Sequence, residues 1–234
     1  MENYVGGQPF CKLVEVSGFN GAIQGMRHPK NSWRLQDSYY ENGEFILGEN
    51  DKKLAQTLIK GGSEHRKFLR MIHVQFNVCM PRYLFSELDT YKIATTSNST
   101  SSMHKLLNSD DEKDWYETEL DVLLNTRGEL SIKNFWFHKE LYPIIEKDIE
   151  VLNEIRKKYL ATKKSDEKRE LKRIAKQVLP ECYLQCRMMD MNYETLRNIY
   201  SQRKNHQLDI EWGIICKFIE ALPYSEELLL FGIM

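Results

Sequence analysis

A helix near the C-terminus carries an arginine at the end of an apolar face. Asn192, Leu196, Ile199 and Arg203 follow one another at intervals of four, three and four residues, which places them on one side of an α-helix. Beside Leu196 and Ile199 the guanidinium is expected to be partly enclosed, and a charge withdrawn from water needs a partner. Arg203 is therefore a candidate for binding an anion or a polarised ring. The alternatives are a surface arginine or an ion pair with a nearby acid, Asp209 or Glu211.

A second candidate is the polar segment ATTSNSTSSM, residues 94–103, which we expect to be a loop. Its hydroxyls and closely spaced backbone N–H groups could surround the oxygens of a phosphate, and Lys92 adds a positive charge just before it. The alternative is a solvated connector, because serine and threonine are common in such segments.

Residues 156–176 form a strongly basic stretch, with ten lysines and arginines against three acids. Such a stripe could bind nucleic acid. A pair of solvated helices with charge pairs along their surface is favoured, because the aromatic residues that would stack on bases are nearly absent.

Composition narrows the class of protein. The chain has 234 residues, of which 41% are apolar and 29% charged, and its formal net charge is -1. This balance is typical of a soluble globular protein and gives no general attraction for nucleic acid. No segment has the pattern of a signal peptide or a membrane span, so we expect a cytoplasmic protein. The odd number of scattered cysteines is typical of reduced thiols and predicts neither disulfides nor a zinc site: Cys11, Cys79, Cys182, Cys186 and Cys216.

Hydrophobic periodicity predicts an α+β fold in a single domain, residues 1–234. The clearest strand is 71–80, in which apolar and polar residues alternate. The helix of Arg203 should span 192–204, and Asp209 is expected to cap a further helix. The other expected elements are a strand at 11–17, a short helix at 51–62, a helical segment after Pro81, and helical structure over 139–178 with a break near 161–166.

A longer pattern surrounds Arg203. It comprises Lys176, the pair Leu179-Pro180, Asn192, Glu194, Leu196 and Asn198. At this spacing, and without a gap, the pattern resembles the C-terminal core of the flavin-dependent thymidylate synthases. That family typically has an arginine, two apolar residues and Leu-Pro. A helix follows that begins Asn-x-Arg-x-Leu and carries an essential arginine eleven residues after the asparagine.

The resemblance extends upstream. The family has a histidine before its central strand and, after that strand, an Arg-His-Arg signature followed by seven residues and a serine. His65 matches the histidine, and Pro81 matches the end of the strand. The signature falls on Thr90, Tyr91, Lys92 and Thr100, the residues flanking its serine become Asn98 and Ser102, and a glutamine before it becomes Glu87.

The resemblance implies a homotetramer whose sites form between subunits, and a central antiparallel or mixed sheet with flanking helices. Such enzymes bind FAD and dUMP, and use a folate methylene and reduced nicotinamide to make dTMP. Arg203 is then implied as the catalytic residue that holds the uracil edge and favours ionisation of ring N3. The implied substrate-binding residues are Glu87, Lys92, Asn98, Thr100, Ser101, Ser102 and Lys176, and the implied cofactor-binding residues are His65, Thr90, Tyr91, Asn192 and Asn198.

Three departures from the family pattern change charge or hydrogen bonding. The signature at 90–92 loses two cations, and its lysine has no bidentate fork of donors. Glu194 places a carboxylate where an arginine would face FAD, and it would repel a nearby pyrophosphate. Glu87 is an acceptor-only group when ionised, which could favour the exocyclic amine of cytosine.

We therefore interpret the chain as a divergent member of this family that transfers a methyl or hydroxymethyl group to C5 of dUMP or dCMP. The main alternative is a nucleotide-binding or interaction protein that keeps the scaffold without flavin chemistry, because fold does not dictate function. A nucleic-acid-binding protein that uses residues 156–176 is the third interpretation.

Overall fold

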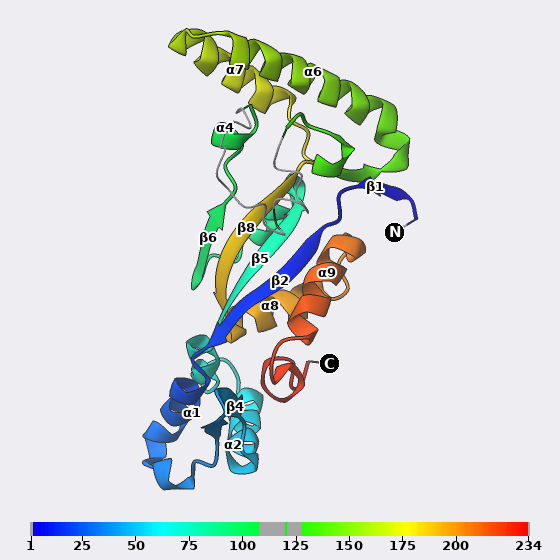
Figure 1. Ribbon diagram of the computed structural model, residues 1–234. Helices are drawn as coiled ribbons and strands as arrows, with labels where there is room; N and C mark the ends of the chain where they lie inside the picture. Colours follow the sequence, from blue (N-terminus) through cyan, green and yellow to red (C-terminus); the bar gives the residue numbers. More distant parts are fainter. Residues whose placement is uncertain (1, 108–119, 121–127, 234) are drawn as a thin grey trace. The chain divides into compact units, whose positions relative to one another are not determined.

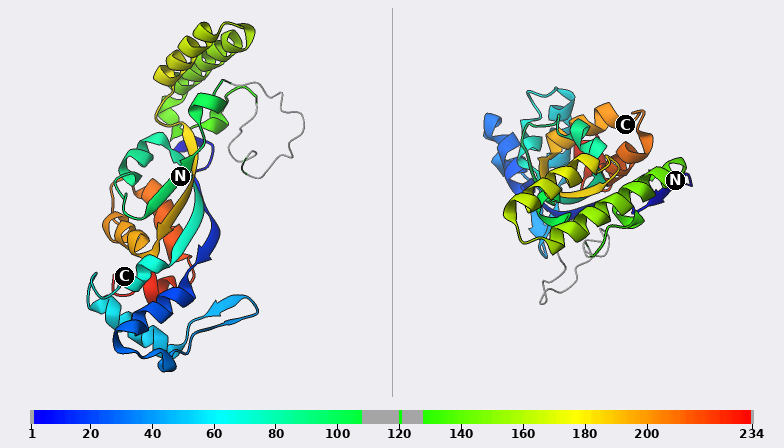
Figure 2. Two further views of the ribbon diagram at one scale, coloured as in Figure 1. Left: turned by 90° about the vertical axis from the view of Figure 1, so that its left-hand side faces the viewer. Right: turned by 90° about the horizontal axis from the view of Figure 1, so that it is seen from above.

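The computed structural model describes residues 2–107, 120 and 128–233 (Figures 1 and 2). The chain divides into two compact units. Unit 1 comprises residues 1–10, 79–88 and 98–187, and unit 2 comprises residues 11–78, 89–97 and 188–234. Helices and antiparallel strands are mixed along the chain, which confirms the α+β prediction. Within the described ranges, no helix combines the length and the apolar character needed to cross a membrane.

The largest sheet has four strands in the order β2-β5-β8-β6. These strands are β2 (Phe10–Ser17), β5 (His73–Pro81), β8 (Leu184–Asn192) and β6 (Thr95–Ser99). In β5, Val74, Phe76 and Val78 are buried while Gln75 is exposed, because successive side chains point to opposite faces of a strand. The strand predicted at 71–80 is confirmed as His73–Pro81, but the predicted alternation ends at Val78, because Cys79 and Met80 are both buried. The strand predicted at 11–17 is confirmed.

The prediction of one polar loop over residues 94–103 is wrong. Residues 95–99 form strand β6, and α4 (Ser102–Lys105) begins three residues later. Threonine is favoured in strands, and β6 is the edge strand of its sheet, where polar side chains can remain in water. Sequence analysis also missed β8, because its methionine-rich run lacks the strict alternation of β5.

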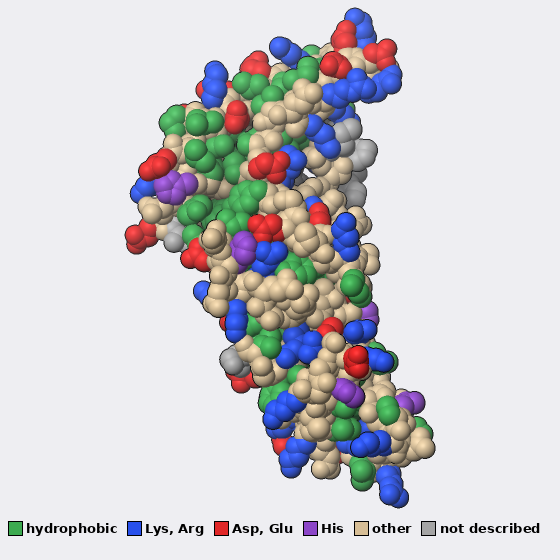
Figure 3. Space-filling model, turned by 180° about the vertical axis from the view of Figure 1, so that it is seen from behind, with side chains coloured by type: hydrophobic (Ala, Val, Ile, Leu, Met, Phe, Trp, Pro, Cys, Tyr) green, Lys and Arg blue, Asp and Glu red, His purple; other side chains and the backbone are tan. Residues whose placement is uncertain are grey.

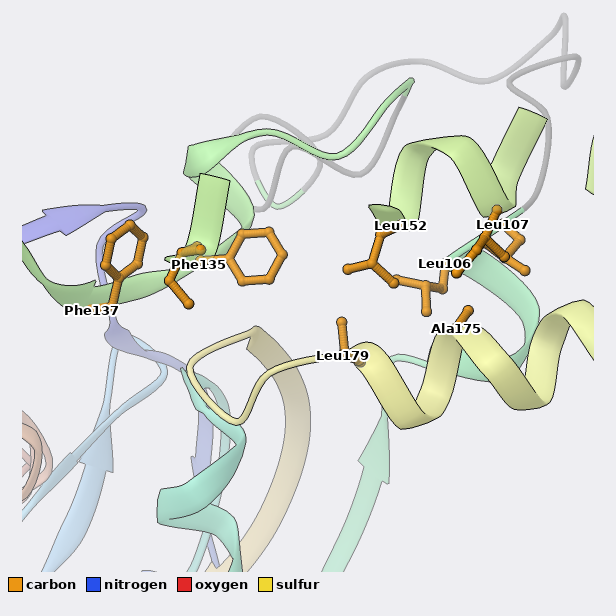
Figure 4. Close-up of a cluster of buried hydrophobic side chains, with 9 residues drawn as sticks. Leu106, Leu107, Phe135, Phe137, Leu152, Ala175 and Leu179 are labelled. Atoms are coloured by element: carbon orange, nitrogen blue, oxygen red, sulfur yellow. The ribbon is translucent and has the colours of Figure 1, made fainter. Parts of the chain in front are cut away.

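Unit 1 contains a helical hairpin made of α6 (Tyr142–Ala161) and α7 (Ser165–Val178), which lie side by side in Figures 1 and 2. Leu152 of α6, Ala175 of α7 and Leu106 belong to one buried cluster, and their side chains face one another in Figure 4. The unit also holds α3 (Arg82–Leu88) and the antiparallel pair β1 (Tyr4–Gly6) and β7 (Trp136–His138). The helical stretch predicted over 139–178, with its break, is confirmed.

The basic stretch 156–176 lies on this hairpin and carries exposed charge pairs. Three ion pairs lie along the start and middle of α7, and each joins residues three positions apart: Lys164 with Glu167, Asp166 with Arg169, and Glu170 with Arg173. Pairs of this kind stabilise a polar helix face in water. They support the interpretation of this stretch as a solvated surface.

Unit 2 contains α1 (Phe19–Arg27), α2 (Glu49–Lys60) and the hairpin β3 (Tyr39–Glu41) and β4 (Glu44–Ile46). A buried ion pair joins the two helices, because Arg27 Nε donates to Asp51 Oδ1 at 2.6 Å. The other carboxylate oxygen of Asp51 accepts from the backbone N–H of Ser38 at 2.8 Å. The short helix predicted at 51–62 is confirmed.

Helices α8 (Tyr193–Arg203) and α9 (Asp209–Glu220) complete the main elements of unit 2. Asn192 caps α8, since its Oδ1 accepts from the backbone N–H of Thr195 at 2.9 Å. The helix predicted over 192–204 is confirmed. Asp209 does not cap the following helix as expected: it is the first helical residue, and Leu208 holds the cap position. The carboxylate still lies where the helix dipole favours negative charge.

Short turns connect these elements. They are 3-10 helices at His28–Lys30, Trp33–Leu35, Lys67–Met71, Ile132–Asn134 and Lys139–Leu141, and a π-helical turn at Ser225–Leu229.

Apolar side chains are exposed around the start of α6. Leu141, Tyr142 and Ile144 are 43%, 41% and 59% exposed. In Figure 3, hydrophobic side chains gather on this part of unit 1. A contiguous exposed apolar surface is typical of a region that contacts another molecule.

The cap of α8 gives a prediction about stability. Asn192→Ala should lower the free energy of unfolding by about 1 kcal/mol, because the Thr195 N–H loses its acceptor. Urea denaturation measures this change, and Asn192→Asp should restore most of the loss. Ser201→Ala, at an exposed position of the same helix, is the control and should change stability by less than about 0.5 kcal/mol. Equal stability of Asn192→Ala and the wild type would contradict the capping role.

Candidate functional site

Arg203 lies in the last turn of α8 against two aromatic rings of unit 2. Its Nε donates to Tyr91 Oη at 2.8 Å. Its Cζ lies 4.7 Å from the ring centroid of Trp212 and 5.6 Å from that of Tyr91. A guanidinium stacks favourably on aromatic rings while its N–H groups bond in its own plane. The side chain is half-buried, so the predicted partial enclosure of Arg203 is confirmed.

Tyr91 connects Arg203 to two further polar side chains. Tyr91 is 7% exposed, and its hydroxyl donates to Gln202 Oε1 at 2.9 Å. The amide of Gln202 then donates from Nε2 to Asn198 Oδ1 at 2.9 Å. Sequence analysis had assigned Tyr91 and Asn198 to cofactor binding. The structure brings them together with Arg203 through Gln202.

Sequence analysis missed Gln202, Trp212 and His206 as neighbours of Arg203. Trp212 is fully buried in α9. The ring of His206 meets that of Trp212 edge-on, with centroids 6.1 Å apart. A helical period could have placed Gln202 beside Asn198, four residues earlier, but α9 packs on α8 only through tertiary folding.

The other predicted residues of unit 2 have different surroundings. His65, Thr90 and Lys92 are exposed. Asn192 is buried, and its side-chain oxygen Oδ1 accepts the hydrogen bond of the helix cap described above. The Nδ2 donors of Asn192 take no part in that bond and are the groups through which this side chain would donate to a ligand.

Glu194 does not present a bare carboxylate. Arg66 Nε donates to both of its carboxylate oxygens, at 3.0 and 2.8 Å, and both side chains are mostly shielded from water. Arg197, one turn further along α8, donates from Nη1 to the backbone oxygen of Leu229 at 2.6 Å. Burial lowers the pKa of Arg197, Arg66 lowers it further, and Glu194 opposes this by raising it. Two cations thus surround one carboxylate.

In unit 1, Thr100 is tied to strand β8. Its backbone N–H donates to Cys186 O at 2.8 Å, and its own carbonyl accepts from Gln185 Nε2 at 2.9 Å. Its hydroxyl oxygen accepts from the N–H of Cys186 at 3.3 Å. The backbone N–H predicted to bind phosphate is therefore used inside the protein. The hydroxyl hydrogen of Thr100 is the donor that these bonds leave for a ligand.

The remaining predicted residues of unit 1 lie partly or fully in solvent. Asn98 is exposed, and Ser101 and Ser102 are half-buried at the start of α4. Glu87 is half-buried on α3, and Lys176 is exposed in the last turn of α7.

Sequence analysis missed Arg187, a cation in β8 beside the residue to which Thr100 is hydrogen-bonded. Arg187 follows Cys186 in that strand, and its Cζ lies 3.9 Å from the ring centroid of Phe85 in α3. Stacking on Phe85, which is 1% exposed, restricts the orientation of this guanidinium.

The cysteine thiols are poorly suited to nucleophilic catalysis. Burial raises the pKa of Cys182, Cys186 and Cys216 to about 11, so these thiols stay protonated at neutral pH. Among the residues whose positions the structure gives, no three histidines, cysteines or acids gather as a metal site.

Comparison with known proteins places this fold. No protein-family model matches the chain, and no curated protein sequence matches it. Solved structures do match it over nearly its whole length, and they show that the chain has the fold of the flavin-dependent thymidylate synthases. The family resemblance seen in the sequence is thereby confirmed at the level of fold.

The solved structures that match include thymidylate synthase X from Helicobacter pylori with FAD and dUMP. It is 18% identical, has a TM-score of 0.64, and the match covers 97% of this chain and 99% of that one. The UMP/dUMP methylase PolB from Streptomyces cacaoi, bound to 5-bromo-dUMP, is 16% identical with a TM-score of 0.60. That match covers 98% of both chains.

The ion pair between Arg66 and Glu194 gives a second prediction about stability. Glu194→Gln should lower the free energy of unfolding by about 2 kcal/mol, because it removes a charged acceptor and leaves Arg66 and Arg197 to repel each other. Urea denaturation measures the loss. Glu170→Gln breaks an exposed pair with Arg173 and should cost less than about 1 kcal/mol. Similar losses in the two variants would show that the Arg66 pair is an ordinary surface contact.

Proposed function

We propose that this protein is an enzyme that transfers a methyl or hydroxymethyl group to C5 of a pyrimidine deoxynucleotide, with dUMP as the default substrate. The single observation that carries the proposal is the setting of Arg203. The position matching an essential arginine of the family holds a guanidinium fixed by Tyr91 and Trp212. The fold is that of proteins whose structures contain dUMP or its 5-bromo analogue, which supports a pyrimidine nucleotide as ligand.

Arg203 would hold the base and stabilise negative charge on it. A guanidinium that donates to the edge of a uracil ring favours the ring form deprotonated at N3, because a charge-assisted bond is strongest to an anion. Fixed donors of this kind need no reorganisation when charge develops during a reaction. Trp212 and Tyr91 keep the guanidinium partly out of water, which strengthens the interaction.

A separate part of the proposal concerns unit 1. Thr100, Ser101 and Ser102 would donate hydroxyl hydrogens to the nucleotide phosphate, and Lys176 would contact the nucleotide as a solvent-exposed cation. Glu87 would face the base. Lys92 of unit 2 would add a point charge to the nucleotide. Each of these roles follows from the family resemblance.

The carboxylate of Glu194, which on sequence grounds would repel the pyrophosphate of FAD, is, in the structure, compatible with that cofactor. Glu194 is neutralised by Arg66, so it does not oppose a nearby pyrophosphate as an unpaired carboxylate would. His65, Thr90, Tyr91, Asn192 and Asn198 are the residues that the family resemblance assigns to FAD. When bound, FAD would pass reducing equivalents from a reduced nicotinamide, with a methylene-folate as carbon donor. The protonated thiols are no obstacle, because the family's chemistry needs no protein nucleophile.

A homotetramer in the cytoplasm is part of the same proposal. The exposed apolar side chains of Leu141, Tyr142 and Ile144 support an association of subunits, because a monomer gains nothing from exposing them.

A second candidate function is nucleotide binding without turnover. It is favoured by the engagement of Tyr91, which is buried and bonded to Arg203 and Gln202 instead of being exposed to a cofactor. Titration with FAD distinguishes the two functions. The enzyme should bind FAD and become yellow, whereas a protein that binds dUMP and stays colourless would be a nucleotide-binding protein.

The role of Arg203 predicts a loss of nucleotide affinity. Arg203→Ala should weaken dUMP binding by about 2 kcal/mol, a change of about 30-fold in Kd, because a charge-assisted contact is lost. Isothermal titration calorimetry measures it. Arg34→Ala removes an exposed arginine of the same unit and should bind dUMP as the wild type does. A wild-type protein that binds neither dUMP nor dCMP would refute the proposed function, and normal binding by Arg203→Ala would refute the role of Arg203.

From the carboxylate of Glu87 we predict that the protein binds cytosine relative to uracil more strongly than a variant without that charge. Its carboxylate can accept from the exocyclic amine of cytosine, so the wild type should bind dCMP relative to dUMP better than Glu87→Gln does, by about tenfold. Competition titrations of the two nucleotides measure the ratio. Glu146→Gln, at an exposed position of unit 1, should leave the ratio unchanged. An unaltered ratio in Glu87→Gln would end this hypothesis.

A further inference from the structure

Three hydrogen bonds in series join Arg203 to Asn198 through Tyr91 and Gln202, all within unit 2. Their direction is fixed by the arginine, which can only donate. Because Tyr91 Oη accepts from Arg203, its single hydrogen is directed to Gln202 Oε1. The amide nitrogen of Gln202 is then left to donate to Asn198 Oδ1.

The series determines what Asn198 can offer to a ligand. The side-chain oxygen of Asn198, Oδ1, accepts from Gln202. Its Nδ2 group, with two hydrogens, therefore points away from Gln202. Asn198 is exposed on α8. The helix face therefore presents a guanidinium at one end of the series and an amide donor at the other.

The aromatic contacts fix the arginine end of this series, whereas Gln202 and Asn198 at the other end are exposed. Tyr91 is 7% exposed and Trp212 is fully buried, and their rings meet edge-on with centroids 6.4 Å apart. Arg203 stacks over Trp212 while its Nε bonds to Tyr91, so both the plane and the direction of the guanidinium are set. A group ordered before its ligand arrives loses less freedom on binding.

We propose that Tyr91 is a positioning residue, which orients Arg203 directly and, through Gln202, turns the amide of Asn198 so that its N–H donors face a ligand. This inference rests on the proposed function. It differs from the direct contact with the cofactor that the family resemblance implies for Tyr91. The ligand that fits has hydrogen-bond acceptors at its edge, such as the carbonyl oxygens and deprotonated ring nitrogen of a flat heterocycle.

The first test needs no ligand. In protein labelled with ¹⁵N, the Nε–H of Arg203 should exchange slowly with water, and Arg203→Lys identifies its resonance. Tyr91→Phe removes one oxygen and keeps the ring, so exchange of this hydrogen should become at least about tenfold faster, as expected when a hydrogen bond is lost. Tyr200→Phe is a matched control. Tyr200 is also 7% exposed and its hydroxyl donates to Glu220, so the variant should leave the Arg203 signal unchanged.

The second test measures dUMP binding by calorimetry. Tyr91→Phe should raise Kd about tenfold, whereas Tyr200→Phe should not change it. Gln202→Glu should weaken binding while the slow exchange of Arg203 Nε–H persists. A carboxylate in place of the amide still accepts from Tyr91 but cannot donate to Asn198, so the Asn198 amide would turn round.

The outcomes separate this inference from the proposed function. If the wild type binds dUMP and Tyr91→Phe changes neither the exchange nor the affinity, the positioning role is overturned and the proposed function stands. If the wild type binds no pyrimidine nucleotide but Tyr91→Phe alone accelerates exchange, the proposed function fails while the orientation of Arg203 by Tyr91 is supported.

Discussion

One guanidinium, held against two aromatic side chains, is the contact on which the candidate site depends. Arg203 ends an apolar helix face, and its charge is stabilised by a hydrogen bond to Tyr91 and by the ring of Trp212. A charge in such a setting keeps a fixed direction, because moving it would break the bond and the stacking together. The surrounding elements position this contact. Asn192 caps the start of α8, and α9 packs on α8 so that Trp212 lies against Arg203.

Two charged side chains elsewhere in the protein have local partners. The carboxylate of Glu194 departs from the family pattern, yet Arg66 binds both of its oxygens. The signature at 90–92 has lost two cations, while Arg187 provides a guanidinium stacked on Phe85 in the strand that binds Thr100. The partly buried charge of Glu194 is thereby stabilised by Arg66 in a chain that shares its fold with a solved structure 18% identical to it.

The sequence predicted the parts of the fold that local patterns determine. The alternation in β5 and the helical period that places Leu196, Ile199 and Arg203 on one face are both visible without coordinates. The strand β8 was missed because Met188, Met189 and Met191 show no clear alternation, and β6 was missed because a Ser/Thr-rich edge strand resembles a loop. These strands form through pairing with neighbours, which a single sequence does not display.

The candidate site was predictable only in part for the same reason. The position of Arg203 followed from periodicity and the family pattern. Its bond to Tyr91, however, joins residues 112 positions apart, and its contact with Trp212 requires α9 to pack on α8. The use of Thr100 N–H by Cys186 was equally hidden, because the two residues are 86 positions apart. Contacts of this kind are tertiary, and they decide which predicted donors are available to a ligand.

A crystal structure of the protein with dUMP tests the central claim most directly. We expect the edge of the uracil ring that carries N3 within about 3 Å of a nitrogen of Arg203, with the bond from Arg203 to Tyr91 retained. A nucleotide bound elsewhere, with the guanidinium of Arg203 making no contact to it, would contradict the account.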